Sequence, residues 1–552
     1  MFVRIKTTPN SPRKSVQIVE SVRDGDKIKQ RIVRHVGVAM DDDELEKLKD
    51  LAEHIKAKIE HEKQPSFFTP ETIAEWAIQS RKEKEQEKAI MVDLKKLKEE
   101  QRIILGIHDI YGEIYQQIGF DQVLSGVRKK NSAKILKDIV LARIANPTSK
   151  RASVIDLEQN FGISLNLERV YRMMDKLDEE TCKKMQKISL DATCQMFGGK
   201  IDVIFADVTT LYFESFTEDD LKRNGYSKDL KFNQPQVLFA LMVTEQGLPI
   251  GYEVFPGSTY EGHTILPLLK KIEQRHELGK VVFVADSGLF SEKSLTLLEE
   301  NGYKYVVGAR LRNLPKNLKE EVVNISSYVS LYKTEEDSVS YREFDYKERR
   351  LITNHSSKRD KKDKHDRNLA IEKLEKKLKK SKNSENLISN YGYKKYLQMK
   401  GESEFELDEK KIQDAEKWDG IHGVITNCKE IQAKEVLKQY KGLWQVEESF
   451  RISKHDLKVR PVYHWTPSRI RAHLAICYMA FSCVRHLEYR TCLQYKKLSP
   501  EAIRRSLTRV QVSILKHSDG KRYALPSEAT QEARKLYHIM GKKYSTIPYQ
   551  LY

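Results

Sequence analysis

Two aspartates stand where their neighbours predict buried strands. Asp207 lies in VIFADVTTLYFES (203–215), directly after four apolar residues, and Asp286 lies in VVFVADSGLFS (281–291), after a run of five. Both runs are typical of strands inside a sheet, and the second aspartate falls where its strand should end. Because a carboxylate in an apolar strand is unfavourable without a balancing partner, we expect one, and a metal ion is a candidate.

A third carboxylate lies in YKGLWQVEESFRISK, residues 440–454. Its spacing predicts a helix on which Glu447 shares a broad face with Trp444, Arg451 and Lys454. The neighbouring Glu448 is the main alternative for the same role. Taken singly, each carboxylate has an ordinary structural explanation, as an edge-strand residue, a helix cap or an ion-pair partner; the conjunction of three favours a shared site.

Three carboxylates suit two Mg²⁺ ions held about 3.5–4 Å apart, with Mn²⁺ as a substitute. In such a site one ion activates an attacking water or sugar hydroxyl, and the other stabilises the oxygen that leaves phosphorus. Magnesium fits better than zinc because hard oxygen ligands dominate. None of the six cysteines forms a Cys-x-x-Cys pair, which also argues against a zinc site.

The overall charge favours a polyanionic partner. The 552 residues carry a formal net charge of +18, although charged residues of both signs make up 32% of the chain. Such an excess is typical of proteins that bind nucleic acid, and it also fits a lysine-rich solvated surface. The longest apolar run, LAICYMAFSCV at 474–484, is too short to span a bilayer, and the N-terminus has no apolar signal core. We therefore expect a soluble cytoplasmic protein without membrane contact.

The elements that position these residues change character along the chain. Alternating apolar positions predict a small antiparallel sheet in residues 1–40, and helical spacing follows. We expect six regions: a small sheet plus helices (1–100), a helical DNA-binding region (101–198), the first part of an α/β core (199–320), an insertion with a basic helix at 358–382 (321–415), the second part of the core (416–490), and a C-terminal helical region (491–552). The helices of 101–198 could equally be an ordinary bundle.

These motifs resemble the DDE transposases of bacterial insertion sequences, in the group with a Tyr-x2-Arg-x3-Glu-x6-Lys signature. Tyr440, Glu447 and Lys454 stand at those spacings, while Leu443 occupies the arginine position. DVTTLYF, GYSKD (225–229), ADSGLFS and RPVYHWTPSRIRAHL (460–474) also look like the family. The departure at Leu443 puts one phosphate contact in doubt, and Arg451 or Lys441 could replace it.

The resemblance implies a ribonuclease-H-like mixed sheet interrupted by a mostly β insertion. It implies Asp207, Asp286 and Glu447 as catalytic metal ligands. It also implies binding to the terminal inverted repeats of an element, cleavage at its ends and joining of 3′-hydroxyls to target DNA by a cut-and-paste route. The protein is then expected to act on double-stranded DNA as a homodimer at the bacterial nucleoid.

Five further residues are candidates for contacts with DNA: Tyr440, Arg451, Lys454, Lys228 and Trp418. Tyr440 could instead be a core aromatic, Lys228 could only shape a turn, and Trp418 could be a buried residue at the start of a strand. The basic helix at 358–382 could clamp DNA or be a solvated arm.

Two other functions fit the same residues. One is a ribonuclease-H-like nuclease that hydrolyses DNA without joining strands. The other is a non-catalytic DNA-binding regulator. An intact set of three distant carboxylates argues against the second.

Overall fold

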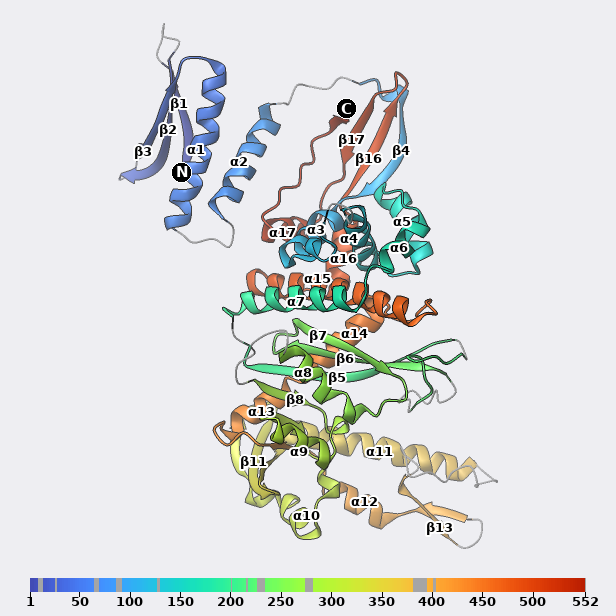
Figure 1. The fold of residues 1–552 in the computed structure, drawn as a ribbon. Helices are drawn as coiled ribbons and strands as arrows, with labels where there is room; N and C mark the ends of the chain where they lie inside the picture. Colours follow the sequence, from blue (N-terminus) through green and yellow to red (C-terminus); the bar gives the residue numbers. More distant parts are fainter. Residues whose placement is uncertain are drawn as a thin grey trace. The chain divides into compact units, whose positions relative to one another are not determined.

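The computed structural model describes residues 1–7, 13–24, 27–63, 69–85, 92–126, 130–199, 201–214, 217–225, 234–273, 281–380, 395–400 and 404–551. The chain divides into two compact units (Figure 1). One comprises residues 1–113, 158–163 and 490–552, and the other comprises 114–157 and 164–489.

The first unit begins with the small antiparallel sheet predicted from the alternating pattern. Strands β1 (Phe2–Thr7), β2 (Lys14–Asp24) and β3 (Lys27–Ala39) pair in chain order. Helix α1 (Asp42–Lys63) packs on this sheet, where Val16 and Ile18 meet Leu45 and Ala52. Helix α2 (Pro70–Glu85) follows. Alternation places apolar side chains on one face, and the helix buries that face.

The same unit holds a four-stranded sheet of order β18-β17-β16-β4. Its strands are β4 (Leu97–Ile104), β16 (Gln511–His517), β17 (Arg522–Pro526) and β18 (Tyr549–Leu551), accompanied by α16 (Pro500–Thr508) and α17 (Gln531–Ile539). Residues 491–552, for which we expected helices, therefore contain strands as well. The reason is non-local: β16 pairs with β4, about 400 residues earlier in the chain.

The second unit is built on a mixed sheet of nine strands, in the order β10-β11-β12-β15-β9-β8-β5-β6-β7. Strands β5 (Val203–Tyr212), β6 (Gln236–Thr244) and β7 (Pro249–Pro256) form an antiparallel meander. Strands β8 (Val282–Ala285) and β9 (Lys304–Gly308) then add in parallel beside β5. Three antiparallel strands followed by two parallel ones is the strand order of a ribonuclease-H-like fold, so the predicted fold class is confirmed.

The sheet continues beyond β9 through β15, in the second part of the core, into strands of the expected insertion. Strand β15 (Ile421–Thr426) pairs antiparallel with β9 and with β12 (Arg349–Ser356), and β11 (Ser338–Tyr346) and β10 (Val329–Lys333) follow. The strands within 321–415 thus extend the core sheet. The basic helix, α11 (Ser357–Lys380), lies with α12 (Glu409–Glu416), β13 (Leu397–Lys400) and β14 (Glu404–Leu407) around a small core of its own.

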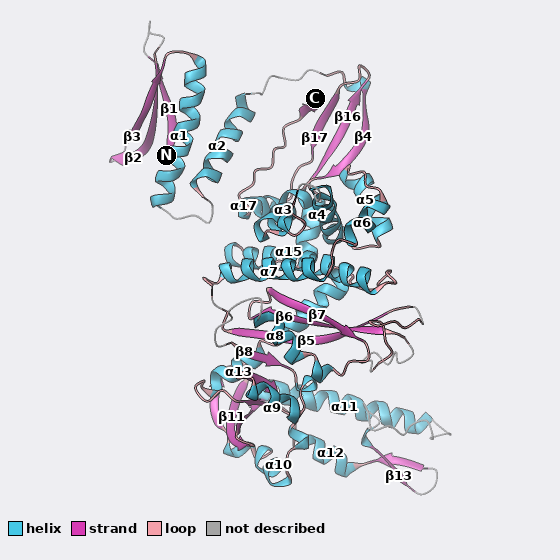
Figure 2. Ribbon diagram, viewed as in Figure 1, coloured by secondary structure: helices cyan, strands magenta, loops and turns pink. Residues whose placement is uncertain are grey.

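Helices cover both faces of the sheet (Figure 2). Helices α8 (Ile265–Glu273), α9 (Glu292–Glu300) and α10 (Lys316–Val322) supply side chains to the core cluster on one face. Helices α13 (Ala433–Lys441) and α14 (Trp444–Arg451) lie against the other, and α14 continues into a π-helical turn, Ile452–Asp456. The remaining helices are α3 (Gly106–Ile118), α4 (Lys130–Ala145), α5 (Lys150–Phe161), α6 (Leu167–Met174), α7 (Glu179–Met196) and α15 (Pro467–Gln494).

Helices α7 and α15 lie side by side next to β7 (Figure 1). The hydroxyls of Ser189 and Ser482 are 3.2 Å apart, and the Thr193 hydroxyl donates to the Pro249 carbonyl at 3.1 Å. The apolar run 474–484 is therefore buried within the protein. Among the described residues, no helix combines the length and apolarity needed to cross a membrane.

Candidate active site

The register of the sheet brings Asp207 and Asp286 to corresponding positions. Phe205 on β5 pairs with Val284 on parallel β8, and the two aspartates each follow two residues later. Side chains alternate between the faces of a strand. Because Ala206 points into the core cluster, Asp207 projects from the opposite face, half-buried, and Asp286 does the same at the exposed end of β8.

Helices α13 and α14 run along that face beside β5. A Cβ atom on Gly442, between the two helices, would lie only 2.6 Å from the ring of Phe205. Farther along, the Lys454 ammonium donates to the hydroxyl of Thr209. Phe205 and Thr209 stand two residues on either side of Asp207, so the segment from 442 to 454 passes directly over this aspartate.

Glu447 lies on the part of α14 that passes over Asp207, and its side chain is exposed. Tyr440 links it to the second aspartate: the tyrosine hydroxyl donates to Asp286 Oδ1 at 3.5 Å. Burial, followed by the negative charges of Asp286 and Glu447, raises the pKa of Tyr440 well above its ordinary value. The phenol therefore stays protonated and remains a hydrogen-bond donor within this carboxylate group.

Gly308 explains how Tyr440 reaches Asp286. This glycine ends β9, next to the position of Asp286, and an added Cβ atom would lie 2.5 Å from the Tyr440 hydroxyl and 3.0 Å from the Ser287 nitrogen. Any larger residue would push the tyrosine away, so the close approach requires glycine here.

Glu448 differs from Glu447 in its partners. Its carboxylate lies 3.7 Å from Arg451 Nη2 and 3.5 Å from Nη1 of Arg485, a buried residue that also pairs with Glu488 at 2.6 Å. Glu448 therefore belongs to an ion-pair network between α14 and α15. This arrangement favours Glu447 as the third carboxylate of the site.

The other candidates for DNA contact do not all lie near the three carboxylates. Lys454 lies beside β5, as described, and Arg451 is exposed and pairs with Glu448 and with Asp456 at 3.7 Å. The ring of Trp418 packs against the core cluster, with the Arg312 guanidinium 5.5 Å from its centre, so it does not join the three carboxylates. Lys228 lies outside the described residues, which include only Gly225 of the GYSKD motif.

Sequence reasoning missed Arg310. Its Nη2 donates to the carbonyl oxygens of Ser287 at 2.9 Å and Gly288 at 3.4 Å, in the turn that Asp286 caps through the Ser287 amide. Arg310 therefore braces the backbone that carries the second aspartate. Its place two residues after β9, the strand adjacent to Asp286, is the signal that could have indicated it.

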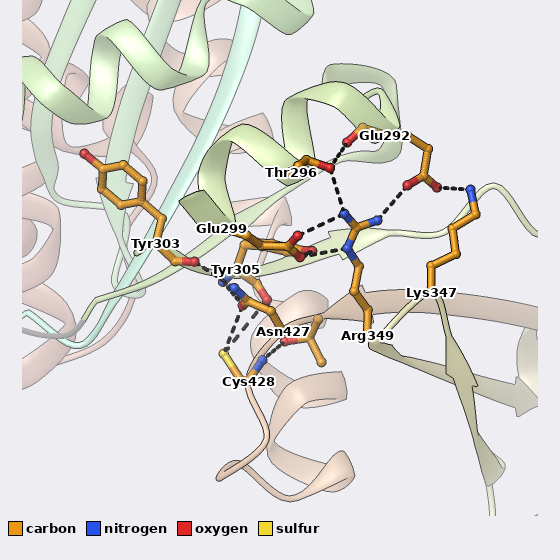
Figure 3. A network of polar contacts seen from close by, with 10 residues as sticks. Glu292, Thr296, Glu299, Tyr303, Tyr305, Lys347, Arg349, Asn427 and Cys428 are labelled. Carbon is orange, nitrogen blue, oxygen red and sulfur yellow. Dashed lines mark hydrogen bonds and ion pairs between the residues drawn. The ribbon is translucent and has the colours of Figure 1, made fainter. Parts of the chain in front are cut away.

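A second polar network holds helix α9, which begins shortly after Asp286 (Figure 3). Arg349 donates to Glu299 at 2.7 Å and to Glu292 at 2.7 Å, and Lys347 adds an ion pair to Glu292 at 3.0 Å. The hydroxyl of Tyr305 on β9 donates to Glu299 at 2.5 Å. The network ties α9 to the hairpin of β11 and β12 and so fixes the frame around the second aspartate.

The donor set of the three candidate residues suits a hard divalent cation, because Asp207, Asp286 and Glu447 offer only carboxylate oxygens. Their spacing is less suited: within the described ranges, no three His, Cys, Asp or Glu side chains are close enough together to hold a metal ion. The chemistry of the ligands therefore fits, and the three side chains would have to move closer to bind.

Comparisons with known proteins identify two parts of the chain. Residues 198–483 match the family model described as the transposase DDE domain, and residues 3–66 match the N-terminal domain of IS1634 family transposases. A search of curated proteins gives no match.

Solved structures with similarity to the chain include two transposase complexes. One is the piggyBac transposase synaptic complex with hairpin DNA, at 10% identity and a TM-score of 0.37, covering 73% of this chain and 79% of that chain. The other is the Mos1 transposase paired-end complex with the left transposon end, at 11% identity and a TM-score of 0.14, covering 47% and 76%.

Proposed function

This chain belongs to the DDE transposases of bacterial insertion sequences, and from that premise we propose that it cuts and joins DNA at the ends of its own element. In this proposal it binds the terminal inverted repeats, frees the element's 3′-hydroxyl ends and transfers them to target DNA at the nucleoid, as a homodimer. The observation that supports the proposal is that Asp207 and Asp286 share one face of the sheet, that α14 with Glu447 lies over this face, and that Tyr440 and Lys454 stand at the signature spacings.

Asp207, Asp286 and Glu447 would hold the divalent metal on which DDE domains generally depend. When bound, such a metal activates the attacking water or hydroxyl and offsets charge at phosphorus. Tyr440 orients the Asp286 carboxylate through its hydroxyl, and Arg310 fixes the backbone beneath it. Lys454, held at Thr209, brings a positive charge beside Asp207, where a phosphate of the scissile strand would lie.

Leu443 cannot supply the phosphate contact that the signature arginine implies. Its side chain is apolar and only 8% exposed, at the start of α14. Arg451 is already paired with two carboxylates, whereas Lys441 is exposed at the end of α13. Of the two substitutes considered from the sequence, Lys441 is therefore the better candidate.

The experiment uses the purified protein and a labelled duplex carrying the element's ends, with Mg²⁺, with Ca²⁺ and with neither, beside the Asp207→Ala variant. We expect nicking at the element's terminus that requires Mg²⁺ and is lost in the variant. A paired-end substrate with target DNA then tests joining. Cleavage without joining would indicate a nuclease, and tight binding without cleavage would indicate a DNA-binding regulator.

A further inference from the structure

The segment 457–466, LKVRPVYHWT, joins the π-helical turn after α14 to α15 and has no role in the site described above. Its side chains alternate between inside and outside. Val462 and His464 are both 9% exposed, whereas Tyr463 and Trp465 between and after them are 60% and 72% exposed. Two large aromatic side chains, two residues apart and both mostly in solvent, are unusual unless they meet a partner.

The backbone of this segment is held from three directions. The Val459 amide donates to the Ser453 carbonyl at 3.0 Å, and the Val459 carbonyl lies 3.0 Å from Nε2 of buried His473 on α15. Arg143 on α4 donates to the Lys458 carbonyl at 3.2 Å. These contacts fix residues 458 and 459, and the buried side chains of Val462 and His464 anchor the part that carries the rings, which lowers the entropy lost when the rings bind a partner.

The segment borders the catalytic strand. The Arg460 guanidinium lies 4.7 Å from the centre of the ring of Tyr212, the last residue of β5. Tyr212 stands five residues after Asp207, which is about 17 Å along an extended strand. The segment also begins three residues after Lys454, whose ammonium donates to Thr209 on the face of Asp207, so a DNA strand held at Asp207 would pass close to the start of the segment.

The charge of the segment suits phosphates. It contains Lys458 and Arg460 and no acidic residue. Behind it lie two buried basic side chains, Arg143 and Lys150, and Lys150 Nζ is 3.4 Å from His473 Nδ1.

We propose that Tyr463 and Trp465 form a stacking platform for unpaired bases of a DNA strand that passes the active site, with Lys458 and Arg460 at its phosphates. Aromatic side chains stack on any base, but only where the bases are unpaired and expose their faces. In the proposed reaction such bases would belong to the strand end beside the cut. The inference deepens the proposed function and rests on it only for the choice of DNA as the ligand.

The test measures binding of an oligothymidylate and of a duplex of the same length to the full-length protein, by tryptophan fluorescence and by anisotropy of labelled DNA. Trp465 should be quenched by the single strand, so Trp465→Phe should lose most of the quenching while Trp76→Phe, on α2 of the other unit, keeps it. Tyr463→Ala and Trp465→Ala should each weaken single-strand binding about tenfold. Duplex binding should change less than about twofold.

Several outcomes would overturn the platform: unchanged single-strand affinity in both alanine variants, equal losses for single strand and duplex, or loss of self-association alone. Melting temperatures equal to that of the wild type show that the variants fold, and Trp465→Phe should retain most of the affinity because a ring remains. The measurement requires no cleavage, so it can fail while the transposase assay succeeds, and the reverse.

Discussion

Two groups of carboxylates in the second unit differ in what balances their charge. Around Arg349, Glu292 and Glu299 are each bonded to a guanidinium, and Lys347 supplies a second cation. At the candidate site, Asp286 bonds to a phenol and a backbone amide, and neither it nor Glu447 forms an ion pair with any described residue. In the first group, side chains of the protein balance the charge of the carboxylates. The second group retains negative charge that a bound cation could balance.

Neutralising the catalytic carboxylates should have the largest effect. Asp207→Asn, Asp286→Asn and Glu447→Gln should each lower the cleavage rate by at least about a thousandfold, because each removes a proposed metal ligand. Melting temperature should fall little or rise, since like charges are relieved. Cleavage assays with Mg²⁺, together with thermal melting, would measure both. A variant that cuts at near wild-type rate would remove that residue from the site.

Removing Arg349 from its group with Glu292 and Glu299 should instead lower the stability of the fold. Arg349→Ala should lower the free energy of unfolding by about 2 kcal/mol at pH 7, since it leaves two carboxylates without their main partner. Calorimetry of the variant and the wild type would measure this, with the exposed Lys347→Ala as a control expected to lose about 0.5 kcal/mol. Equal losses in the two variants would contradict a central role for Arg349.

The difference in stability between the wild type and Arg349→Ala should depend on pH. The hydrogen bond from Arg349 lowers the pKa of Glu299, and for Glu292 it does so against the opposing effect of burial. Depressed carboxyl pKa values stabilise the folded state above their ordinary value of about 4.5, and this stabilisation is lost as the pH falls through the lowered values. The difference in melting temperature between wild type and Arg349→Ala should therefore shrink below about pH 4.5.

Glu448→Gln should distinguish the role of Glu448 from that of Glu447. It should lower stability by about 1 kcal/mol, because buried Arg485 loses one of two anionic partners, and leave the cleavage rate within about threefold of wild type. Comparison with Glu447→Gln in the same two assays tests the register of α14. The opposite pattern would assign the third carboxylate to Glu448.

The smallest effect is expected from Tyr440→Phe. Loss of the hydroxyl removes its 3.5 Å hydrogen bond to Asp286 and keeps the ring, so cleavage should slow about fivefold, with DNA affinity unchanged. Single-turnover rates and binding in Ca²⁺ would distinguish the two effects. A loss of affinity at unchanged rate would instead point to a phosphate contact from Tyr440.

Much of the fold followed from local pattern. The apolar runs before Asp207 and Asp286 predicted β5 and β8, and the alternation in residues 1–40 predicted the first sheet. These predictions succeed because a strand buried on both faces is continuously apolar, and a strand buried on one face alternates apolar and polar residues. The register brings Asp207 and Asp286 to one face of the sheet and α14 lies over it, while the catalytic role of these residues and of Glu447 stays a prediction.

What local pattern missed depends on distant partners. Strand β16 forms against β4, and β12 joins the core sheet only through β15, which follows it by 65 residues in the chain. The role of Arg310 depends on its hydrogen bond to the Ser287 carbonyl, which forms only in the folded protein. In each case the stabilising contact lies outside any window in which periodicity can be read.

The position of α14 also has a consequence during protein synthesis. Glu447 follows Asp207 by 240 residues, so at about 5–20 residues per second it leaves the ribosome roughly 10–50 s later. A nascent chain, or one released early within the insertion, carries both aspartates but not the glutamate. If the three carboxylates act together as proposed, the chain cannot cleave DNA until α14 has been translated, and shorter products are inactive.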